Sequence, residues 1–259
     1  MACPDTPDLN SEKLFDRQTQ LFGKEVQERI LKSTVFLQRL NPILSEVAKN
    51  AVLQGFNLVL NDDACLTEVD LKKNLLVSET HRDRMQSRRL DILMPLLKEL
   101  NPLVSITPFM NVLGTFEEVH GCQVAFLTPK DREEWEIWSH QLATYQGDVL
   151  VLMAVEGKYI AVFGNPDRPI WGPKLLESLT EYQEYCPAST GVFQAALVAN
   201  TPLCPEADLP YVLSTVFGSI LNQILLSIIM KKQRRQRLVI FDAIGEAPDH
   251  IDSSNYWAF

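Results

Sequence analysis

Apolar and polar positions near the start of this chain follow first a helical and then a strand-like period, which predicts a βαβ unit. The pattern predicts a charged amphipathic helix from 16 to about 31, a buried strand at 34–37, a second helix at 43–54 and a second strand at 58–60. Helices and strands that alternate in this way favour a parallel sheet covered by helices. We therefore expect an α/β fold organised around this unit.

The alternation continues along the rest of the chain. A turn at Glu156-Gly157 predicts that the strands on either side of it form a hairpin. Pro95 predicts a kink or break in its helix, and Pro129 is predicted to occupy the first position of another helix. Asp16 is predicted to cap the first helix of the chain. The further helices are expected at 85–100, 129–145, 174–184 and 210–230, and the further strands at 104–108, 123–127, 149–154, 158–163 and 238–241.

The segment 210–230 is uncharged over about 20 residues, which is long enough to span a membrane. A basic run at 231–237 follows it, as a cytoplasmic flank would. Asn222 and Gln223 lie in its middle, however, and an apolar strand pattern follows almost at once. These features favour a buried crossover helix, and a membrane-anchored scaffold is the alternative.

Composition narrows the function classes. The net charge of −9 argues against a general nucleic-acid-binding surface. Five scattered cysteines without a Cys-x-x-Cys pair, and four histidines without ligand spacing, argue against a zinc site and suit a reducing compartment. The polar first eleven residues are not expected to be a signal peptide.

The turn at 38–45 is the first candidate for chemistry, because a nucleotide-binding βαβ unit carries a glycine-rich turn there. Such a turn lets a phosphate approach the backbone N–H groups of the following helix. The turn at 38–45 contains no glycine. The chain therefore has the unit without a phosphate loop, which argues against a dinucleotide-dependent oxidoreductase.

The chain opens with Phe15-Asp16-Arg17-Gln18, followed by Leu21-Phe22-Gly23 and Gln27. This motif resembles the opening of the ThiF/MoeB-like activating enzymes, and above all of the small, non-catalytic subunits of heterodimeric SUMO-activating enzymes, and it carries the most specific match. Later matches follow in the order of the family. They are Glu46 to Asn50 with Gln54-Gly55, Leu100-Asn101-Pro102, Gly218 to Gln223 and Leu238 to Asp242.

This resemblance implies a Rossmann-like adenylation fold, with a mostly parallel central sheet, helices on both faces and a degenerate nucleotide loop. It implies a flexible tail at 1–12 and an inactive adenylation domain over 13–259. A short insert is expected at about 165–207, where the family carries insertions of variable size. Cys186 and Cys204 are the candidates for a thioester-forming cysteine, but neither has a histidine near it in sequence, so structural roles are favoured.

Aligned with the family, the phosphate-loop glycines fall on Arg39, Pro42 and Leu44. Asp62 matches the residue that contacts the ribose, and Arg89 matches a basic residue that meets phosphates. Both are interpreted as vestigial, so no cofactor is expected in this chain and Mg-ATP is expected in the partner subunit. From the residues alone, Asp62 is a turn or cap residue and Arg89 belongs to a solvated helix face.

Arg17 lies in the first turn of its predicted helix, where a cation opposes the helix dipole and needs another partner. The residues alone favour a salt bridge to a nearby carboxylate such as Asp16 or Glu25. The resemblance implies that Arg17 reaches across, in trans, to ATP bound by the partner.

The resemblance therefore implies a regulatory subunit of a SUMO-activating enzyme, not catalytic alone, which completes the adenylation site of an obligate catalytic partner. Contact with the modifier would be indirect, with no nucleic acid or membrane partner. The location implied is nuclear, with the cytoplasm left open as a second site. The alternatives are the cognate subunit for another ubiquitin-like modifier and a non-enzymatic scaffold with this fold.

Overall fold

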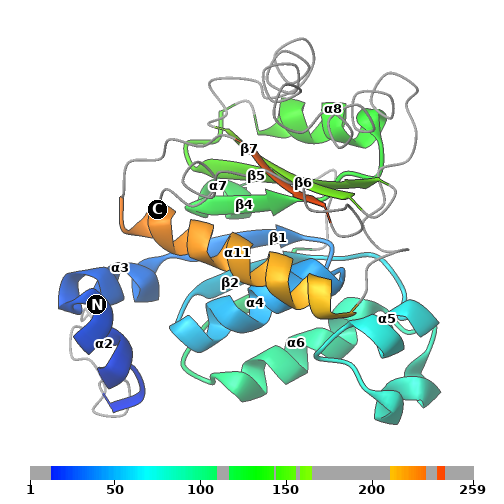
Figure 1. Cartoon of the computed structure of the whole chain (residues 1–259), viewed down its shortest axis with the longest axis horizontal. Coiled ribbons are helices and arrows are strands. Elements are labelled where there is room, and N and C mark those ends of the chain that lie inside the picture. Colours follow the sequence, from blue (N-terminus) through cyan, green and yellow to red (C-terminus); the bar gives the residue numbers. More distant parts are fainter. Residues whose placement is uncertain are drawn as a thin grey trace, which may run out of the picture.

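A computed structural model shows a seven-stranded sheet with helices on both of its faces (Figure 1). The strand order is β3-β2-β1-β4-β5-β6-β7. This arrangement confirms the predicted α/β architecture. The residues that the structure describes are 13–109, 117–142, 144–155, 158–164, 211–231 and 238–242.

The sheet is parallel from β3 to β5 and antiparallel at β6 and β7. The predicted hairpin is confirmed, because β5 and β6 pair antiparallel. The strands are β1 Thr34–Gln38, β2 Asn57–Asn61, β3 Ile106–Pro108, β4 Val124–Leu127, β5 Asp148–Val155, β6 Lys158–Gly164 and β7 Leu238–Asp242.

Most helices follow the predicted order, and they place the longest one, α11, beside α4. The helices are α2 Asp16–Phe22, α3 Lys24–Lys32, α4 Pro42–Gln54, α5 Glu68–Lys73, α6 Arg89–Leu100, α7 Glu117–His120, α8 Arg132–Gln141 and α11 Tyr211–Ile229, with a 3₁₀ helix, η1, at Glu79–Arg84.

Alternating residues of β1 face two different layers. Val35 and Leu37 are buried in the same core as the apolar side of α4. Phe36 points the other way, and its ring lies 5.5 Å from the ring of Trp138 in α8. Because successive side chains of a strand point to opposite faces, this run of apolar residues covers both sides of the sheet.

The late helix α11 packs closely on α4 through Gly218. A Cβ atom at Gly218 would lie 2.7 Å from Cβ of Glu46 and 3.1 Å from the carbonyl oxygen of Ile43. None of the helices in the described ranges combines the length and the hydropathy of a membrane span. The interpretation of 210–230 as a buried crossover helix is supported by the close packing of α11 on α4.

Several predicted helix boundaries are wrong. The first helix is interrupted at Gly23, whose φ of 87° leaves the helical region, and its N-cap is Phe15 rather than Asp16. The helix after β4 is capped by the Asp131 side chain, so Pro129 precedes it. Pro95 does not end α6, because it lies on the exposed side, where water can satisfy the freed carbonyl. The predictions for 1–12, 165–207 and the helix at 174–184 lie outside the described residues.

Candidate functional site

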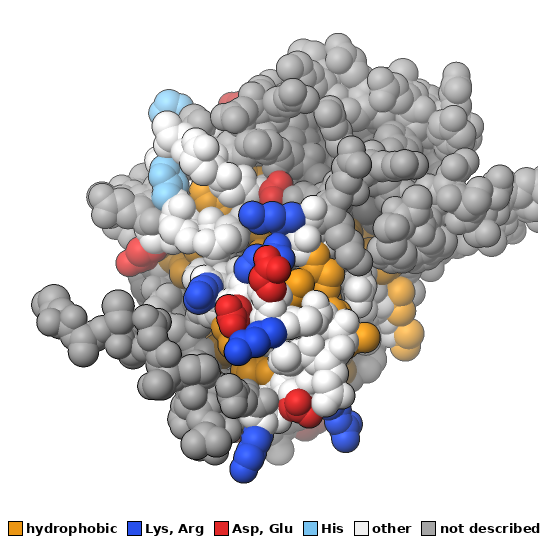
Figure 2. Space-filling view, turned by 90° about the vertical axis from the view of Figure 1, so that its left-hand side faces the viewer, with side chains coloured by type: hydrophobic (Ala, Val, Ile, Leu, Met, Phe, Trp, Pro, Cys, Tyr) orange, Lys and Arg blue, Asp and Glu red, His pale blue; other side chains and the backbone are white. Residues whose placement is uncertain are grey.

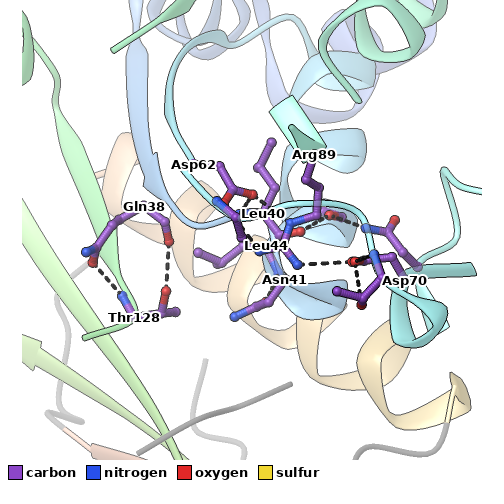
Figure 3. A network of polar contacts seen from close by, with 12 residues as sticks. Gln38, Leu40, Asn41, Leu44, Asp62, Asp70, Arg89 and Thr128 are labelled. Atoms are coloured by element: carbon purple, nitrogen blue, oxygen red, sulfur yellow. Dashed lines mark hydrogen bonds and ion pairs between the residues drawn. The ribbon is translucent and has the colours of Figure 1, made fainter. Parts of the chain in front are cut away.

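The candidate site lies at the carboxyl ends of β1 and β4, where the order of strands reverses and where open α/β sheets form a ligand-binding crevice. From β1 the chain moves outward through β2 and β3, then returns to place β4 on the other side of β1. Open α/β sheets bind ligands at such a switch point. The glycine-free turn that follows β1 lies here, together with the residues drawn in Figure 3.

Two side chains tie the ends of β1 and β4 together. The Gln38 side-chain oxygen accepts a hydrogen bond from the backbone N–H of Thr128 at 3.0 Å. The Thr128 hydroxyl donates in return to the carbonyl oxygen of Gln38 at 2.8 Å. Both residues are buried, and Figure 3 shows the two bonds side by side. The mouth of the crevice is therefore bridged by the protein's own polar groups.

Arg39, at the first of the expected glycine positions, extends this bridge to α8. Its φ of 62° is the left-handed conformation that glycine adopts most readily. Its guanidinium lies 2.6 Å from a carboxylate oxygen of Glu134 and donates to the carbonyl oxygen of Thr128 at 3.3 Å. The backbone thus keeps a glycine-like shape, while the side chain occupies the crevice.

The first turn of α4 offers little to a phosphate. Asn41 caps the helix by accepting from the backbone N–H of Leu44 at 2.9 Å, and Pro42 has no N–H to donate. The Leu40 and Leu44 side chains are fully buried around this turn. The N-terminus of a helix would otherwise attract an anion, but here the Asn41 cap accepts from one of its N–H groups and apolar side chains cover it.

Asp62, after β2, holds the turn from the other side. Its carboxylate accepts from the backbone N–H of Leu40 at 2.9 Å and from that of Ala64 at 3.0 Å. The interpretation of Asp62 as a residue that caps a turn is therefore confirmed. Figure 3 shows it directed at the turn and at Arg89.

Arg89 is 1% exposed and lies between two carboxylates. Its Nε atom is 2.7 Å from Oδ2 of Asp62, and its Nη1 atom is 3.0 Å from Oδ1 of Asp70. Asp70 accepts in addition from the backbone N–H of Thr67 at 2.9 Å. The interpretation of Arg89 as part of a solvated face is wrong, because its guanidinium compensates two buried charges. These carboxylates serve the fold, and the described residues hold no cluster suited to a metal ion.

Two members of this network, Thr128 and Glu134, are not singled out by the sequence. Thr128 simply follows an apolar strand. Glu134 lies in the first turn of α8, and its N–H is capped by Asp131 at 2.9 Å. Acidic residues are common in the capped first turn of helices in general, so the presence of Glu134 there did not indicate a contact with Arg39.

Arg17 lies far from this crevice. It is exposed on α2, which packs at the amino ends of the strands, where α3 enters β1 and α4 leads into β2 (Figure 1). On the face that includes this region, side chains of both charge signs are interspersed with hydrophobic patches (Figure 2). Arg17 therefore cannot serve the crevice of its own chain.

Neither of the carboxylates that flank Arg17 in sequence pairs with it. Asp16 accepts from the Gln20 side chain at 2.8 Å, and Glu25 pairs with Arg29 at 3.2 Å. Within the described ranges, Arg17 makes no ion pair. The predicted salt bridge to Asp16 or Glu25 is wrong, and the guanidinium is presented to the outside of the chain.

The cysteines separate into two groups. Cys122 is buried, and desolvation raises the pKa of its thiol to about 12, with a further contribution from Glu118. Cys65 is exposed, close to Asp62 in sequence. Cys186 and Cys204, the two candidates for a thioester, lie outside the described residues.

The sequence is similar to subunits and enzymes that activate ubiquitin-like modifiers. It is 31% identical over 107 residues to SUMO-activating enzyme subunit 1 of Dictyostelium discoideum, covering 41% of this chain and 32% of that protein. It is 29% identical over 132 residues to the DNA damage tolerance protein rad31 of Schizosaccharomyces pombe, covering 49% and 42%. It is 28% identical over 216 residues to human ubiquitin-like modifier-activating enzyme 7, covering 81% and 21%. The matches therefore span less than half of each relative.

Solved structures share the fold at low sequence identity. The structure of selenomethionine PaaA has a TM-score of 0.68 at 13% identity, covering 93% of this chain and 82% of that one. The structure of E. coli MccB with ATP has a TM-score of 0.62 at 12% identity, covering 90% and 68%. No protein-family model matches the chain. In its motifs, its fold and the sequences it is similar to, the chain resembles the ThiF/MoeB-like superfamily of ubiquitin-like-modifier activating enzymes.

Proposed function

We propose that the chain is the regulatory subunit of a heterodimeric SUMO-activating enzyme, which completes the adenylation site of a catalytic partner. The observation that carries this proposal is the filled crevice, in which Arg39 and Glu134 lie 2.6 Å apart where a nucleotide would enter. A chain whose own site is occupied in this way serves adenylation best by contributing to another site. Mg-ATP then binds to the partner and not to this subunit.

Arg17 is the group that this subunit contributes. In adenylation a carboxylate oxygen of the modifier bonds to the α-phosphorus of ATP, and the bond to the β-phosphate breaks to release pyrophosphate. Negative charge builds up on the phosphate oxygens, and a cation held in place from a second subunit stabilises it. Arginine suits this role because it stays charged and offers a planar fork of donors.

The surface beside Arg17 has the character of a protein interface. Leu21, on the same helix, is 76% exposed. It lines a groove of about 720 Å³ together with Phe22 and Val26 of the N-terminal helices, Leu226 of α11 and Met230, which directly follows α11. Obligate interfaces are more apolar than the rest of a protein surface and bury upward of ~2,000 Å². We therefore place the catalytic partner over this groove and over α2.

The test uses the purified heterodimer with the catalytic SUMO-activating subunit and measures SUMO-dependent exchange of pyrophosphate into ATP. Arg17→Ala should leave assembly intact and lower the exchange rate by about 10²-fold, the scale of losing one preorganised donor. Arg17→Lys should recover part of the loss, since lysine carries the charge without the fork. Lys24→Ala is the matched control, because Lys24 is exposed on the neighbouring helix. Wild-type exchange by Arg17→Ala would refute the role of Arg17.

A second candidate is the cognate subunit for another ubiquitin-like modifier. It is favoured by the similarity to ubiquitin-like modifier-activating enzyme 7, which covers 81% of this chain. Affinity capture of the stoichiometric partner from the source cell separates the two, since each partner accepts its own modifier. Exchange supported by a modifier other than SUMO, with the captured partner, would establish this candidate in place of the first.

A further inference from the structure

The last turn of α4 is a meeting point for segments far apart in the sequence. The last four carbonyl groups of a helix have no partner within it and must find donors elsewhere. In α4, the carbonyl of Ala51 accepts from the N–H of Phe56 at 3.0 Å. That of Val52 accepts from the N–H of Gly55 at 3.0 Å and from the Asn101 side chain at 2.8 Å. The first two of the four carbonyls are therefore satisfied by the helix end and by the Leu-Asn-Pro motif.

The other two carbonyls receive glutamine side chains from the N-terminal helices. The amide of Gln18, on α2, donates to the carbonyl of Leu53 at 3.1 Å. The amide of Gln27, on α3, donates to that of Gln54 at 3.2 Å. All four carbonyls are thus paired, and two of the five donors come from the opening motif of the chain.

Phe15 completes the attachment of α2. A Cβ atom at Gly55 would lie 3.0 Å from the Cζ atom of Phe15 and 2.8 Å from Cδ2 of Leu31, so both side chains lie directly on this glycine. Gly55 has a φ of 99° and ends α4 in the left-handed conformation. Phe15, 2% exposed, is therefore locked against the end of the same helix that Gln18 contacts.

α2 fully buries none of its seven residues, although Phe22 at its end packs against the core. In the described part of the chain, its first turn is attached to the end of α4 through Phe15 and Gln18. Phe15 is the residue directly before α2, and Gln18 directly follows Arg17 in the first turn of the helix. The Oε1 atom of Gln18 is buried and accepts no hydrogen bond from the described part of the chain. Within that part, the bond to the Leu53 carbonyl is therefore the hydrogen bond that holds this side chain. Loss of this bond would let the first turn of α2, which carries Arg17, swing about Phe15.

We propose that Gln18 is a positioning residue, which fixes the first turn of α2 on the Leu53 carbonyl and so aims Arg17 at the partner's nucleotide. This inference rests on the proposed function, because it assigns Gln18 to the same in-trans site. The physical reason is that a charged group stabilises a transition state only when it is held in place beforehand. A hydrogen bond from the adjacent residue to a rigid helix end supplies that restraint.

The test measures exchange by heterodimers in which the hydrogen bond alone is changed. Gln18→Glu keeps the size of the side chain but replaces the donor by an acceptor, and its charge is repelled by the negative end of α4. We expect the kcat for exchange to fall about tenfold, with the KM for ATP and the assembly of the heterodimer unchanged. Gln18→Lys restores a donor that the helix end attracts, and should stay within about threefold of wild type.

Gln20→Glu is the matched control on the same helix. Gln20 is exposed, and its side chain bonds only to Asp16 of its own helix among the described residues. A change of amide to carboxylate there alters the charge of α2 equally without touching α4. Exchange should therefore remain at the wild-type rate.

A double-mutant cycle separates positioning from a general structural effect. If Gln18 acts through Arg17, then Gln18→Glu should lower the exchange rate no further in an Arg17→Ala heterodimer. An undiminished tenfold loss in that background, or wild-type exchange by Gln18→Glu alone, would overturn the positioning role and leave Arg17 in its place. Wild-type exchange by Arg17→Ala would overturn both the proposed role of Arg17 and this inference.

Discussion

The Nε atom of Arg89 lies 2.7 Å from the Oδ2 atom of Asp62, with both side chains at most 1% exposed. Asp62, which the resemblance matches to a residue that contacts the ribose, is therefore paired with a cation inside the chain. A second carboxylate, from Asp70, holds the other end of the guanidinium. The Asp62–Arg89 pair also stabilises the glycine-free turn, because the Asp62 carboxylate accepts a hydrogen bond from the backbone N–H of Leu40.

The isolated, folded chain should not bind ATP. The crevice is bridged by Gln38 and Thr128 and filled by Arg39, so a nucleotide would have to break hydrogen bonds that the protein already makes. Isothermal titration calorimetry with Mg-ATP is the measurement. Binding at micromolar concentration would show that the crevice still opens to a nucleotide.

Asp62→Ala should destabilise the fold strongly. Removing one member of a buried ion pair leaves the other charge uncompensated, which costs about 3–5 kcal/mol. The lower end applies here, because Asp70 still faces Arg89. Urea unfolding gives the change in free energy, and Asp91→Ala is the control, since Asp91 pairs with Arg88 at the surface. An exposed pair of that kind is worth about 0–1 kcal/mol.

Comparable midpoints for Asp62→Ala and Asp91→Ala would contradict the assignment of Asp62 to a buried structural pair. They would instead mean that water or a shift of α6 compensates Arg89. The slope of the unfolding curve should stay the same in both variants, because neither changes the surface exposed on unfolding.

Gly218→Ala should destabilise the chain although alanine favours a helix. In an isolated helix the change stabilises by about 1 kcal/mol. Here the added Cβ would lie 2.7 Å from Cβ of Glu46, so α11 has to move away from α4, at a cost of about 1–3 kcal/mol. Ser219→Ala is the control on the exposed side of the same helix. A melting temperature of Gly218→Ala at or above wild type would show that the two helices are less closely packed.

Iodoacetamide at pH 8 should modify Cys65 and spare Cys122 in the folded chain. Burial raises the pKa of the Cys122 thiol from 9.0 to about 12, which lowers its thiolate fraction by about a thousandfold, and the reactive species is the thiolate. Peptide mapping by mass spectrometry reports each site. Unfolding in urea should make both sites react, and equal labelling in the native state would contradict the buried position of Cys122.

The same shift predicts a loss of stability in alkali. In the unfolded chain the Cys122 thiol ionises above pH 9.0, whereas in the folded chain it stays protonated to about 12. Proton loss therefore favours unfolding, and the free energy of unfolding should fall as the pH rises through this window. Cys122→Ala should flatten the fall between pH 9 and 11, measured by urea unfolding. If the free energy of unfolding of Cys122→Ala fell with pH as steeply as that of the wild type, the loss of stability would belong to other titratable groups.

The βαβ unit could be predicted from sequence because its elements are set by local periodicity. The apolar run before Gln38 and the helix that ends at Gly55 both carry their own signals. Boundaries were harder, because they depend on single contacts. Gly23 interrupts the first helix through its backbone conformation, and Pro95 remains inside α6 because that side of the helix is exposed.

The site itself was only partly predictable. The missing glycines are visible in the sequence, and so is the carboxylate after β2. The partners of these residues are not visible in the sequence, because Arg89 is 27 residues from Asp62 and Thr128 is 90 residues from Gln38. An arginine at the start of a helix looks solvated unless the fold that surrounds it with two carboxylates is known.

The filled crevice also makes the two subunits of the proposed pair unequal. Two copies of an intact adenylation fold would each lend an arginine and each receive one, giving two equivalent reaction centres. In the proposed pair the exchange runs one way, because Arg17 is offered outward while Arg39 and Glu134 close the place where a returned arginine would act. The assembly should therefore bind one ATP per two subunits. A modifier that meets this assembly would therefore encounter a single productive face.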